Sequence, residues 1–202
     1  MIELYFWTTD NGRKGLMGAE ESGLPYTRKP VDLTKREQFQ PEFLKISPGH
    51  KIPALVDTEG PGGRVTLCES GAILKYLAEK SGKLYPTDPA KRIKVDQWFF
   101  YGTSTWTPLA QQYGLFMHRF GEDVPPAKKH YDGVVRDIFG IFDKHLADNQ
   151  FMGGSEFSIA DISSYPDVHI HGVQGMGIDS YPNLKRWHDT VAARPAVQRA
   201  WA

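Results

Sequence analysis

The sequence has a polar loop at a position where many thiol-handling proteins carry a reactive cysteine. The apolar run IELYF, residues 2–6, leads into the segment WTTDNG, which contains Thr9 and Asn11 but no cysteine. A hydroxyl and an amide NH₂ can donate hydrogen bonds to a sulfur atom without reacting themselves. Thr9 and Asn11 could therefore stabilise a thiolate that a ligand brings, helped by the dipole of the following helix. For Asn11 alone, an Asx turn that caps this helix is an equally good interpretation.

A second polar pair, Glu69 and Ser70, comes directly before an apolar helical pattern. A helix N-terminus offers unpaired N–H groups and the positive end of a dipole, which together bind carboxylates. The Ser70 hydroxyl and amide could therefore hold a carboxylate, and Glu69 could pair with an ammonium group. The structural alternative is an ordinary N-cap serine beside a solvated acid, because serine is common at N-caps.

The elements that must position these residues follow the order β-α-β-(α)-β-β-α over residues 1–84. Ile2, Leu4 and Phe6 alternate as in a strand. Gly23 and Gly82 are expected to end the two main helices. The segment YTRKPVDL predicts an edge strand, because Pro30 has no N–H to donate to a ladder. The runs PALVD and RVTLCE predict a hairpin around a Gly/Pro-rich turn.

The second half of the chain has helical spacing instead. Residues 91–202 are expected to form an all-helical domain after the proline-containing linker YPTDPAKR. Ser158 and Asp161 have the spacing of a variant capping box at a helix start. Pro195 is expected to end the helix of YPNLKRWHDTVAARP. The many aromatic residues of 98–116 are expected to form helix core.

The amino-acid composition limits the classes of function that the protein can have. Lys plus Arg and Asp plus Glu number 24 each, so the charge balance gives no broad reason to bind nucleic acid or an anionic membrane. No apolar run approaches the roughly 20 residues that cross a bilayer. The N-terminus lacks the features of a signal peptide, and the single cysteine, Cys68, excludes an intramolecular disulfide. We expect a cytoplasmic protein that needs no metal.

Several stretches together resemble the cytosolic glutathione transferases. They are SPGHKIPALVD, ESGAILKYLAEK, FSIADI and YPNLKRWHDTVAARPAVQRA, and they occur in the order of that family. The segments IELYFWTTDNGRK and VDLTKREQFQPEFLKISP are similar to the bacterial nu-class transferases, the disulfide-bond oxidoreductases. The resemblance implies an α/β plus all-α architecture: a thioredoxin-like glutathione-binding domain over residues 1–84 and a helical bundle over residues 91–202.

The resemblance also implies roles for individual residues. Glutathione would place its γ-glutamyl carboxylate at Ser70, its ammonium at Glu69 and its sulfur at Thr9 and Asn11. These positions match the family's motifs in this sequence.

The central and glycyl parts of glutathione would meet a second segment. A cis peptide before Pro53 would let the Ile52 backbone pair with the tripeptide. Lys51 and Gln38 could meet the glycyl carboxylate, although a solvated lysine is the usual fate of such a residue. His50 stands where the family tends to have Asn; a weak contact to the same carboxylate and a solvent-facing loop position remain equally open.

Other reactive residues are interpreted as structural. Tyr5 lies inside the strand rather than at its end, and Cys68 ends an apolar strand, where a buried cysteine is usually inert.

Trp7 could line a second-substrate pocket. His130 is the residue nearest to where the family's second domain places a basic ligand contact. His169 and His171 point to different helix faces, which argues against a metal site.

These observations and the resemblance together predict an enzyme that uses glutathione to reduce disulfides or peroxides, and the resemblance implies that it works as a homodimer. Two alternatives remain: a transferase that conjugates carbon electrophiles, and a non-catalytic binding protein that keeps the fold.

Overall fold

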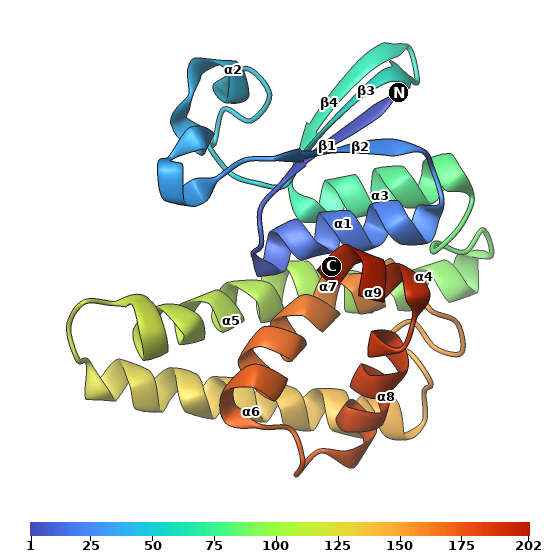
Figure 1. Ribbon diagram of the computed structural model, residues 1–202. Coiled ribbons are helices and arrows are strands. Elements are labelled where there is room, and N and C mark those ends of the chain that lie inside the picture. Colours follow the sequence, from blue (N-terminus) through green and yellow to red (C-terminus); the bar gives the residue numbers. More distant parts are fainter. The chain divides into compact units, whose positions relative to one another are not determined.

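The computed structural model describes residues 1–202, apart from the side chain of Val173. The chain forms two compact units, which are described separately (Figure 1). The first consists of Met1–Tyr85 together with Arg194–Ala202, and the second of Pro86–Ala193. Among the described residues, no helix is both long enough and apolar enough to cross a membrane.

The first unit contains a mixed four-stranded sheet in the order β2-β1-β3-β4. Strand β2 is parallel to β1, and the remaining pairs are antiparallel. The elements, in chain order, are β1 (Ile2–Phe6), α1 (Asp10–Ser22), β2 (Tyr26–Pro30), the short helical turns η1 (Leu33–Lys35) and η2 (Glu37–Phe39), α2 (Pro41–Leu44), β3 (Ala54–Gly60), β4 (Gly63–Cys68) and α3 (Ser70–Ser81). The predicted element order, the edge position of β2 and the hairpin are confirmed.

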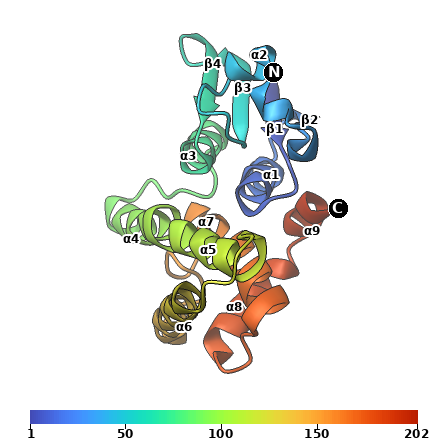
Figure 2. The same cartoon turned by 90° about the vertical axis from the view of Figure 1, so that its left-hand side faces the viewer.

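The two faces of this sheet have different environments. Ile2, Leu4 and Leu55 are buried on the face that α1 and α3 cover (Figure 2). The register aligns Lys29, Tyr5, Ala54 and Cys68 across the four strands, so these residues lie on the opposite face. The short helix α2 covers only part of that outer face, where Phe43 packs near Tyr5 with ring centroids 6.1 Å apart.

Both main helices of the unit end where the sequence predicts. Gly23 follows α1 and Gly82 follows α3, each with a positive φ near 70° that glycine adopts without strain.

The last helix, α9 (Pro195–Trp201), packs in the first unit rather than with the helical domain where the sequence placed it. Arg194 pairs with Glu21 at 2.6 and 2.7 Å, and Arg199 pairs with Glu20 at 2.7 Å, so both anchor the C-terminus to α1. Pro195 does not simply end the preceding helix. It occupies the first position of a new one, where its missing N–H is no disadvantage.

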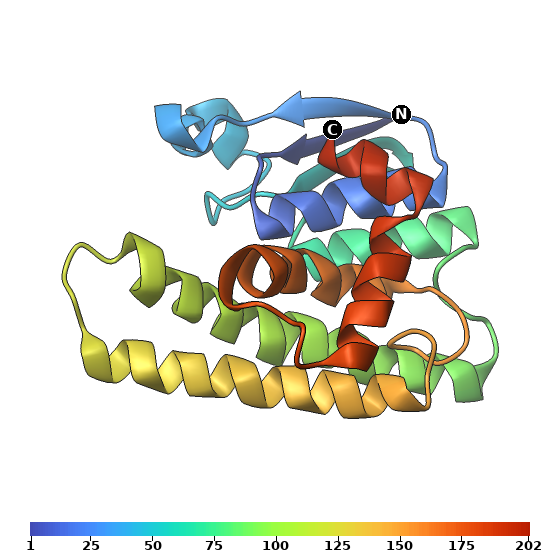
Figure 3. The same ribbon diagram turned by 60° about the horizontal axis from the view of Figure 1, so that its bottom comes forward.

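The second unit is helical. Its elements are α4 (Pro89–Phe100), the π-helical segment η3 (Tyr101–Trp106), α5 (Thr107–Gly114), a second π-helical segment η4 (Leu115–Arg119), α6 (Pro125–Ala147), α7 (Ile159–Asp167), a third π-helical segment η5 (Val168–Met176) and α8 (Pro182–Ala192). The long helix α6 is the yellow helix in Figure 3. Part of the predicted linker is helical, because Asp88 caps α4 by accepting the Lys91 N–H at 2.9 Å.

The predicted capping box at Ser158 and Asp161 is present. Asp161 is fully buried and also accepts hydrogen bonds from the Met152 amide at 2.8 Å and from Trp187 Nε1 at 2.7 Å. Burial raises its pKa to about 6, although these donors oppose the shift. Asp161 therefore caps the start of α7 and also links α7 to α8 through its hydrogen bond from Trp187.

Candidate functional site

The side chains of Asn11 and Ser70 meet, although they come from the starts of two different helices. Ser70 Oγ donates a hydrogen bond to Asn11 Oδ1 at 3.3 Å, and both residues are half-buried. Asn11 lies in the first turn of α1, and Ser70 is the first residue of α3. The contact therefore joins the two polar motifs that the sequence singles out, at a point where two helix N-termini can attract an anion.

This contact also orients the Asn11 amide. Its oxygen is occupied by Ser70, and among the described residues its Nδ2 atom donates no hydrogen bond. The Asx-turn interpretation of Asn11 is wrong, because the cap of α1 is formed by Thr9. The Asn11 NH₂ group thus remains available to donate to a ligand atom.

Thr9 is the N-cap of α1. Its Oγ1 accepts a hydrogen bond from the Gly12 amide at 3.1 Å, in an extended backbone conformation typical of caps. Because a hydroxyl has one donor and two acceptor positions, this bond leaves its hydrogen free for a second partner. Capping and donation to a sulfur are therefore compatible in one side chain.

The Ile52-Pro53 motif lies against the same helix, one turn further along. A Cβ at Gly15 would lie 3.1 Å from Pro53 Cβ, so glycine allows α1 to approach Pro53 closely. Asn11 and Gly15 are four residues apart and share a face of α1. The peptide between Ile52 and Pro53 is cis. Asn11, Pro53 and Ser70 are thus gathered around the first turns of α1.

Backbone geometry distinguishes Glu69 from an ordinary helix-capping residue. It precedes α3 with φ 68° and ψ 119°, a region that non-glycine residues rarely occupy, and its side chain makes no capping bond. Such strained residues cluster at functional sites. The N-cap interpretation of Ser70 is also wrong, because Ser70 already lies within the helix and its hydroxyl points to Asn11. Glu69 is exposed and directly precedes Ser70, so its carboxylate is accessible to a ligand.

The segment around Lys51 has backbone groups without partners. Among the described residues, no backbone hydrogen bond outside helices and strands involves Ile52. Lys51 is exposed, and its backbone is held by Ser47, whose Oγ donates to the Lys51 carbonyl at 2.8 Å. The half-buried Ile52 can therefore offer both an N–H and a C=O to an extended peptide.

Gln38 and His50 come from two segments that touch each other. The ring of Phe39, next to Gln38, lies 4.9 Å from the ring of His50. Gln38 Oε1 is buried without a hydrogen-bond partner. His50 is exposed, with a φ of 48°. No contact joins either residue to Asn11 or Ser70 directly, so their contact with a ligand stays a prediction.

Tyr5 and Cys68 lie on the outer face of the sheet. Tyr5 donates to Glu3 Oε2 at 3.0 Å; burial first, and then this bond, raises its pKa. The Cys68 thiol donates to the Ile46 carbonyl at 3.2 Å and packs on the cluster of Val31, Phe43 and Ala54. Both contacts agree with the structural roles that the sequence favours.

In the second unit, the histidines point to different neighbours. His169 Nδ1 lies 3.0 Å from His188 Nε2, whereas His171 packs edge-on against Tyr113. Of the aromatic residues that were expected to form helix core, Phe99, Trp106 and Tyr113 are buried, with Trp106 against Phe139, whereas Trp98, Tyr101 and Phe116 are half-buried. Phe100 is an exception at 56% exposed. The proposed roles of His130 and Trp7 stay predictions.

Sequence reasoning missed the part that two glycines play. Gly12 packs so closely on the Trp7 carbonyl that any Cβ would collide with it. Gly15 leaves room for Pro53 to pack against α1. Gly15 looks like a residue that weakens the helix when considered alone. Its four-residue spacing from Asn11 is the signal that could have identified it.

Comparison with known proteins agrees with this geometry. Residues 11–80 match the description "Glutathione S-transferase, N-terminal domain", and residues 107–195 match "Glutathione S-transferase, C-terminal domain". The disulfide-bond oxidoreductase YfcG of Escherichia coli is 39% identical over 99% of this chain and 94% of that protein. The disulfide-bond oxidoreductase YghU of the same organism is 34% identical over 98% of this chain and 73% of that protein.

Solved structures show the same likeness. A glutathione transferase family member from Pseudomonas fluorescens with two glutathione bound has a TM-score of 0.93 and 37% identity, covering 99% of this chain and 92% of that one. A glutathione transferase from Pseudomonas putida with one glutathione disulfide bound per subunit has a TM-score of 0.93 and 36% identity, covering 99% and 90%. Together with the matched domains, these similarities show that the chain belongs to the glutathione S-transferase family.

Proposed function

We propose that this protein is a glutathione-dependent disulfide oxidoreductase whose reacting sulfur is supplied by glutathione. The observation that carries the proposal is the Ser70–Asn11 hydrogen bond, which leaves the Asn11 NH₂ group as a donor at the start of α1. Relatives that are named disulfide-bond oxidoreductases, and similar structures with glutathione or its disulfide bound, support the same chemistry.

The binding roles follow from the charges of glutathione. The γ-glutamyl carboxylate binds the Ser70 amide at the N-terminus of α3, and Glu69 pairs with the ammonium group. Ile52 extends its backbone along the tripeptide, directly before Pro53. Lys51, with Gln38 and His50 on the neighbouring segments, faces the glycyl carboxylate.

The reaction is a thiol–disulfide exchange. Thr9 and Asn11 donate hydrogen bonds to the glutathione sulfur, which favours the thiolate over the thiol. The thiolate attacks one sulfur of the substrate, forming a mixed disulfide and releasing the other sulfur as a thiolate. A second glutathione thiolate then attacks the mixed disulfide, which gives glutathione disulfide and the second substrate thiol. Peroxides are a further class of oxidant for the same activated sulfur.

We also propose that the protein acts as a homodimer in the cytoplasm. The single cysteine suits a reducing compartment, where disulfides do not persist. Ile93 and Phe100 lie seven residues apart on one side of α4 and are 69% and 56% exposed, so these two apolar side chains are suited to contact with a second subunit.

Steady-state reduction of bis(2-hydroxyethyl) disulfide by glutathione tests this function. We expect Asn11→Ala to lower kcat/KM by about 100-fold, as when one hydrogen-bond donor to a developing anion is removed. Thr9→Val should lower it similarly, and Thr9→Ser, which keeps both hydroxyl and cap, should restore it. Thr8→Val is the matched control, because the exposed Thr8 precedes the cap.

Cys68→Ala separates this mechanism from one that uses the protein's own thiol. We expect its kcat/KM to stay within about twofold of the wild type, since the Cys68 thiol faces the Ile46 carbonyl. Loss of activity in Cys68→Ala, or full activity in Asn11→Ala, would contradict the proposal. Fast conjugation of aryl halides with no disulfide reduction would favour the transferase alternative, and binding of glutathione with no turnover would favour a binding protein.

A further inference from the structure

A groove lies on the outer face of the sheet in the first unit, away from the face that α1 and α3 cover. It exists because α2 and the turn η2 cover only part of that face. Its volume is about 720 Å³, within the range of about 300–1,000 Å³ that small-molecule sites occupy. The lining residues are Tyr5, Lys29, Pro30, Val31, Glu37, Gln40, Glu42, Phe43, Lys45, Ile46 and Arg64.

The floor of the groove is apolar and aromatic. The rings of Tyr5 and Phe43 are tilted by 53° to each other, with centroids 6.1 Å apart. Val31 and Phe43 are buried, and Ile46 packs beside them. Hydrogen bonding and packing fix these residues, because the Tyr5 hydroxyl is bound to Glu3. The half-buried Tyr5 and Ile46, supported by the buried Val31 and Phe43, thus offer a preformed surface to a flat apolar molecule.

The acidic groups at the groove are already engaged. Glu3 accepts from Tyr5 and pairs with Lys29 at 3.1 Å, and Glu42 pairs with Lys45 at 2.7 Å. Glu37 accepts the Asp32 amide at 2.7 Å. These contacts satisfy the carboxylates and leave each of the two lysines with a partner.

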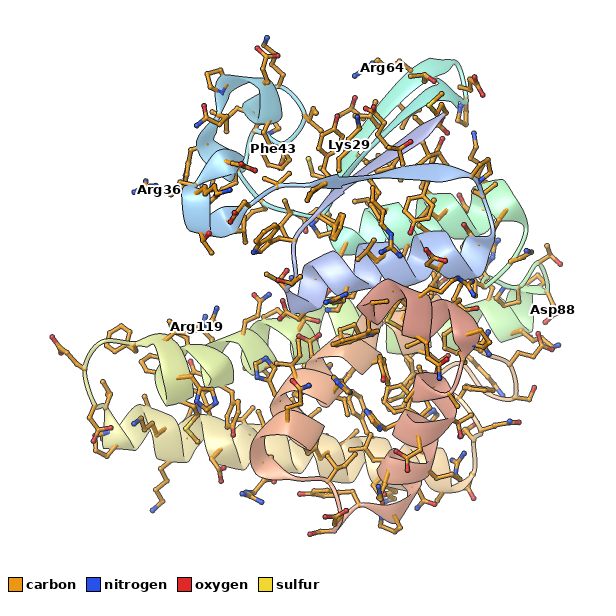
Figure 4. The ribbon with its side chains drawn as sticks, in the orientation of Figure 1. Lys29, Arg36, Phe43, Arg64, Asp88 and Arg119 are labelled. Carbon is orange, nitrogen blue, oxygen red and sulfur yellow. The ribbon has the colours of Figure 1, made fainter. Side chains whose placement is uncertain are left out.

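Arg64 differs from the two lysines. Its guanidinium makes no ion pair or hydrogen bond with any residue that the structure describes, although it lines the same groove from β4. Figure 4 shows Lys29 and Arg64 on the strands and Phe43 on the α2 segment, with Arg36 at the far side of that segment. The groove therefore combines an aromatic floor with a cation whose bidentate donors are unused.

We propose that this groove binds a small aromatic carboxylate, with its ring on Tyr5 and Ile46 and its carboxylate on the Arg64 guanidinium. Lys29, which keeps donors beyond its bond to Glu3, lies on the opposite edge strand and adds to the attraction. The site is separate from the residues proposed to hold glutathione, since none of those residues lines it.

Titration with 2-naphthoate, followed by amide chemical shifts of the full-length protein, tests the proposal. It is done with saturating glutathione and again without it, so that the two sites are distinguished. We expect saturable shifts at Tyr5, Lys29, Phe43, Ile46 and Arg64 under both conditions. The uncharged isostere 2-naphthamide should bind about tenfold more weakly, as loss of a charge-assisted hydrogen bond requires.

Two arginine variants test where the carboxylate of the ligand binds. Arg64→Gln should weaken 2-naphthoate binding about tenfold and leave 2-naphthamide binding unchanged, because only the charged group contacts this residue. Arg36→Gln is the matched control, an exposed arginine of the same unit that does not line the groove. The proposal is overturned by a lack of saturable shifts, by shifts confined to other residues, by complete competition from glutathione, or by equal affinity in Arg64→Gln.

Discussion

Ser70 Oγ lies 3.3 Å from Asn11 Oδ1, and this contact spans 59 residues of sequence. It fixes which end of the Asn11 amide faces Ser70 and therefore which end faces a ligand. The same serine begins α3, so one residue both orients the proposed sulfur donor and offers an amide to a carboxylate. Glutathione carries these two groups on one molecule.

The coupling of the two residues can be measured by a double-mutant cycle of Asn11→Ala, Ser70→Ala and the double variant. We expect Ser70→Ala to change the Kd for glutathione little, because the amide that holds the carboxylate remains, and to lower kcat/KM about tenfold, because the Asn11 amide loses the hydrogen bond that orients it. The effects of the two changes on kcat/KM should deviate from additivity by about 0.5–3 kcal/mol. Calorimetry and steady-state kinetics give these values; strictly additive effects would show that Ser70 does not position Asn11.

Gly12→Ala should disturb the loop that carries Thr9 and Asn11. A Cβ at this position collides with the Trp7 carbonyl oxygen, and the backbone cannot yield as a flexible side chain can. We expect a loss of about 1–3 kcal/mol in the free energy of unfolding, together with reduced activity. Urea denaturation checks the first value. Gly49→Ala is the matched control, because a Cβ there meets no atom within 4 Å.

Asp57 should give stability a defined pH dependence. Burial alone would raise the pKa of this carboxyl, but hydrogen bonds from Lys80 and Tyr76, both at 2.7 Å, and from the Glu59 amide outweigh burial and hold the pKa well below its usual value. The folded state thus prefers the ionised form. Its contribution to stability is complete above the unfolded pKa of about 3.9 and is lost as the pH falls through the lower, folded pKa.

The variant Asp57→Asn tests this expectation by urea denaturation at several pH values. The wild type should be more stable than the variant at neutral pH, and the difference should shrink progressively below about pH 4. A difference that stays constant, or grows toward acid, would show that the charge of Asp57 does not stabilise the fold.

The exposed Ile93 and Phe100 on α4 should mediate dimerisation. The double variant Ile93→Glu, Phe100→Glu puts two charges on this face, and their desolvation should oppose association. We expect a shift from dimer to monomer in light scattering, with a helical circular dichroism signal like that of the wild type. Ile141→Glu on α6 is the control, since Ile141 is also exposed at 45%. An unchanged dimer would place the interface elsewhere.

The order of elements in the first unit was predictable because each element has a strong local signal. Ile2, Leu4 and Phe6 alternate, Gly23 and Gly82 end helices, and Pro30 marks an edge strand. The capping box at Ser158 was equally readable. The separate helix α9 was not, because its docking depends on the ion pairs of Arg194 and Arg199 with α1, which are remote in sequence.

The sequence identifies the candidate site residues, but it does not show which of them contact one another. Spacing identifies Asn11 and Ser70 as polar residues at helix starts, whereas their mutual hydrogen bond depends on how α1 packs against α3. The roles assigned to Asn11 as an Asx cap and to Ser70 as an N-cap follow from local preference, and tertiary contacts override both. The groove near Arg64 is invisible in the sequence, because it depends on how much of the sheet a four-residue helix leaves uncovered.

A crystal structure of this protein with glutathione disulfide tests the central claim most directly. The account predicts a ligand sulfur within hydrogen-bond distance of Thr9 Oγ1 or Asn11 Nδ2, with the γ-glutamyl carboxylate on the Ser70 amide. A ligand whose sulfur lies away from both residues, or whose γ-glutamyl group leaves Ser70 without contact, would contradict it.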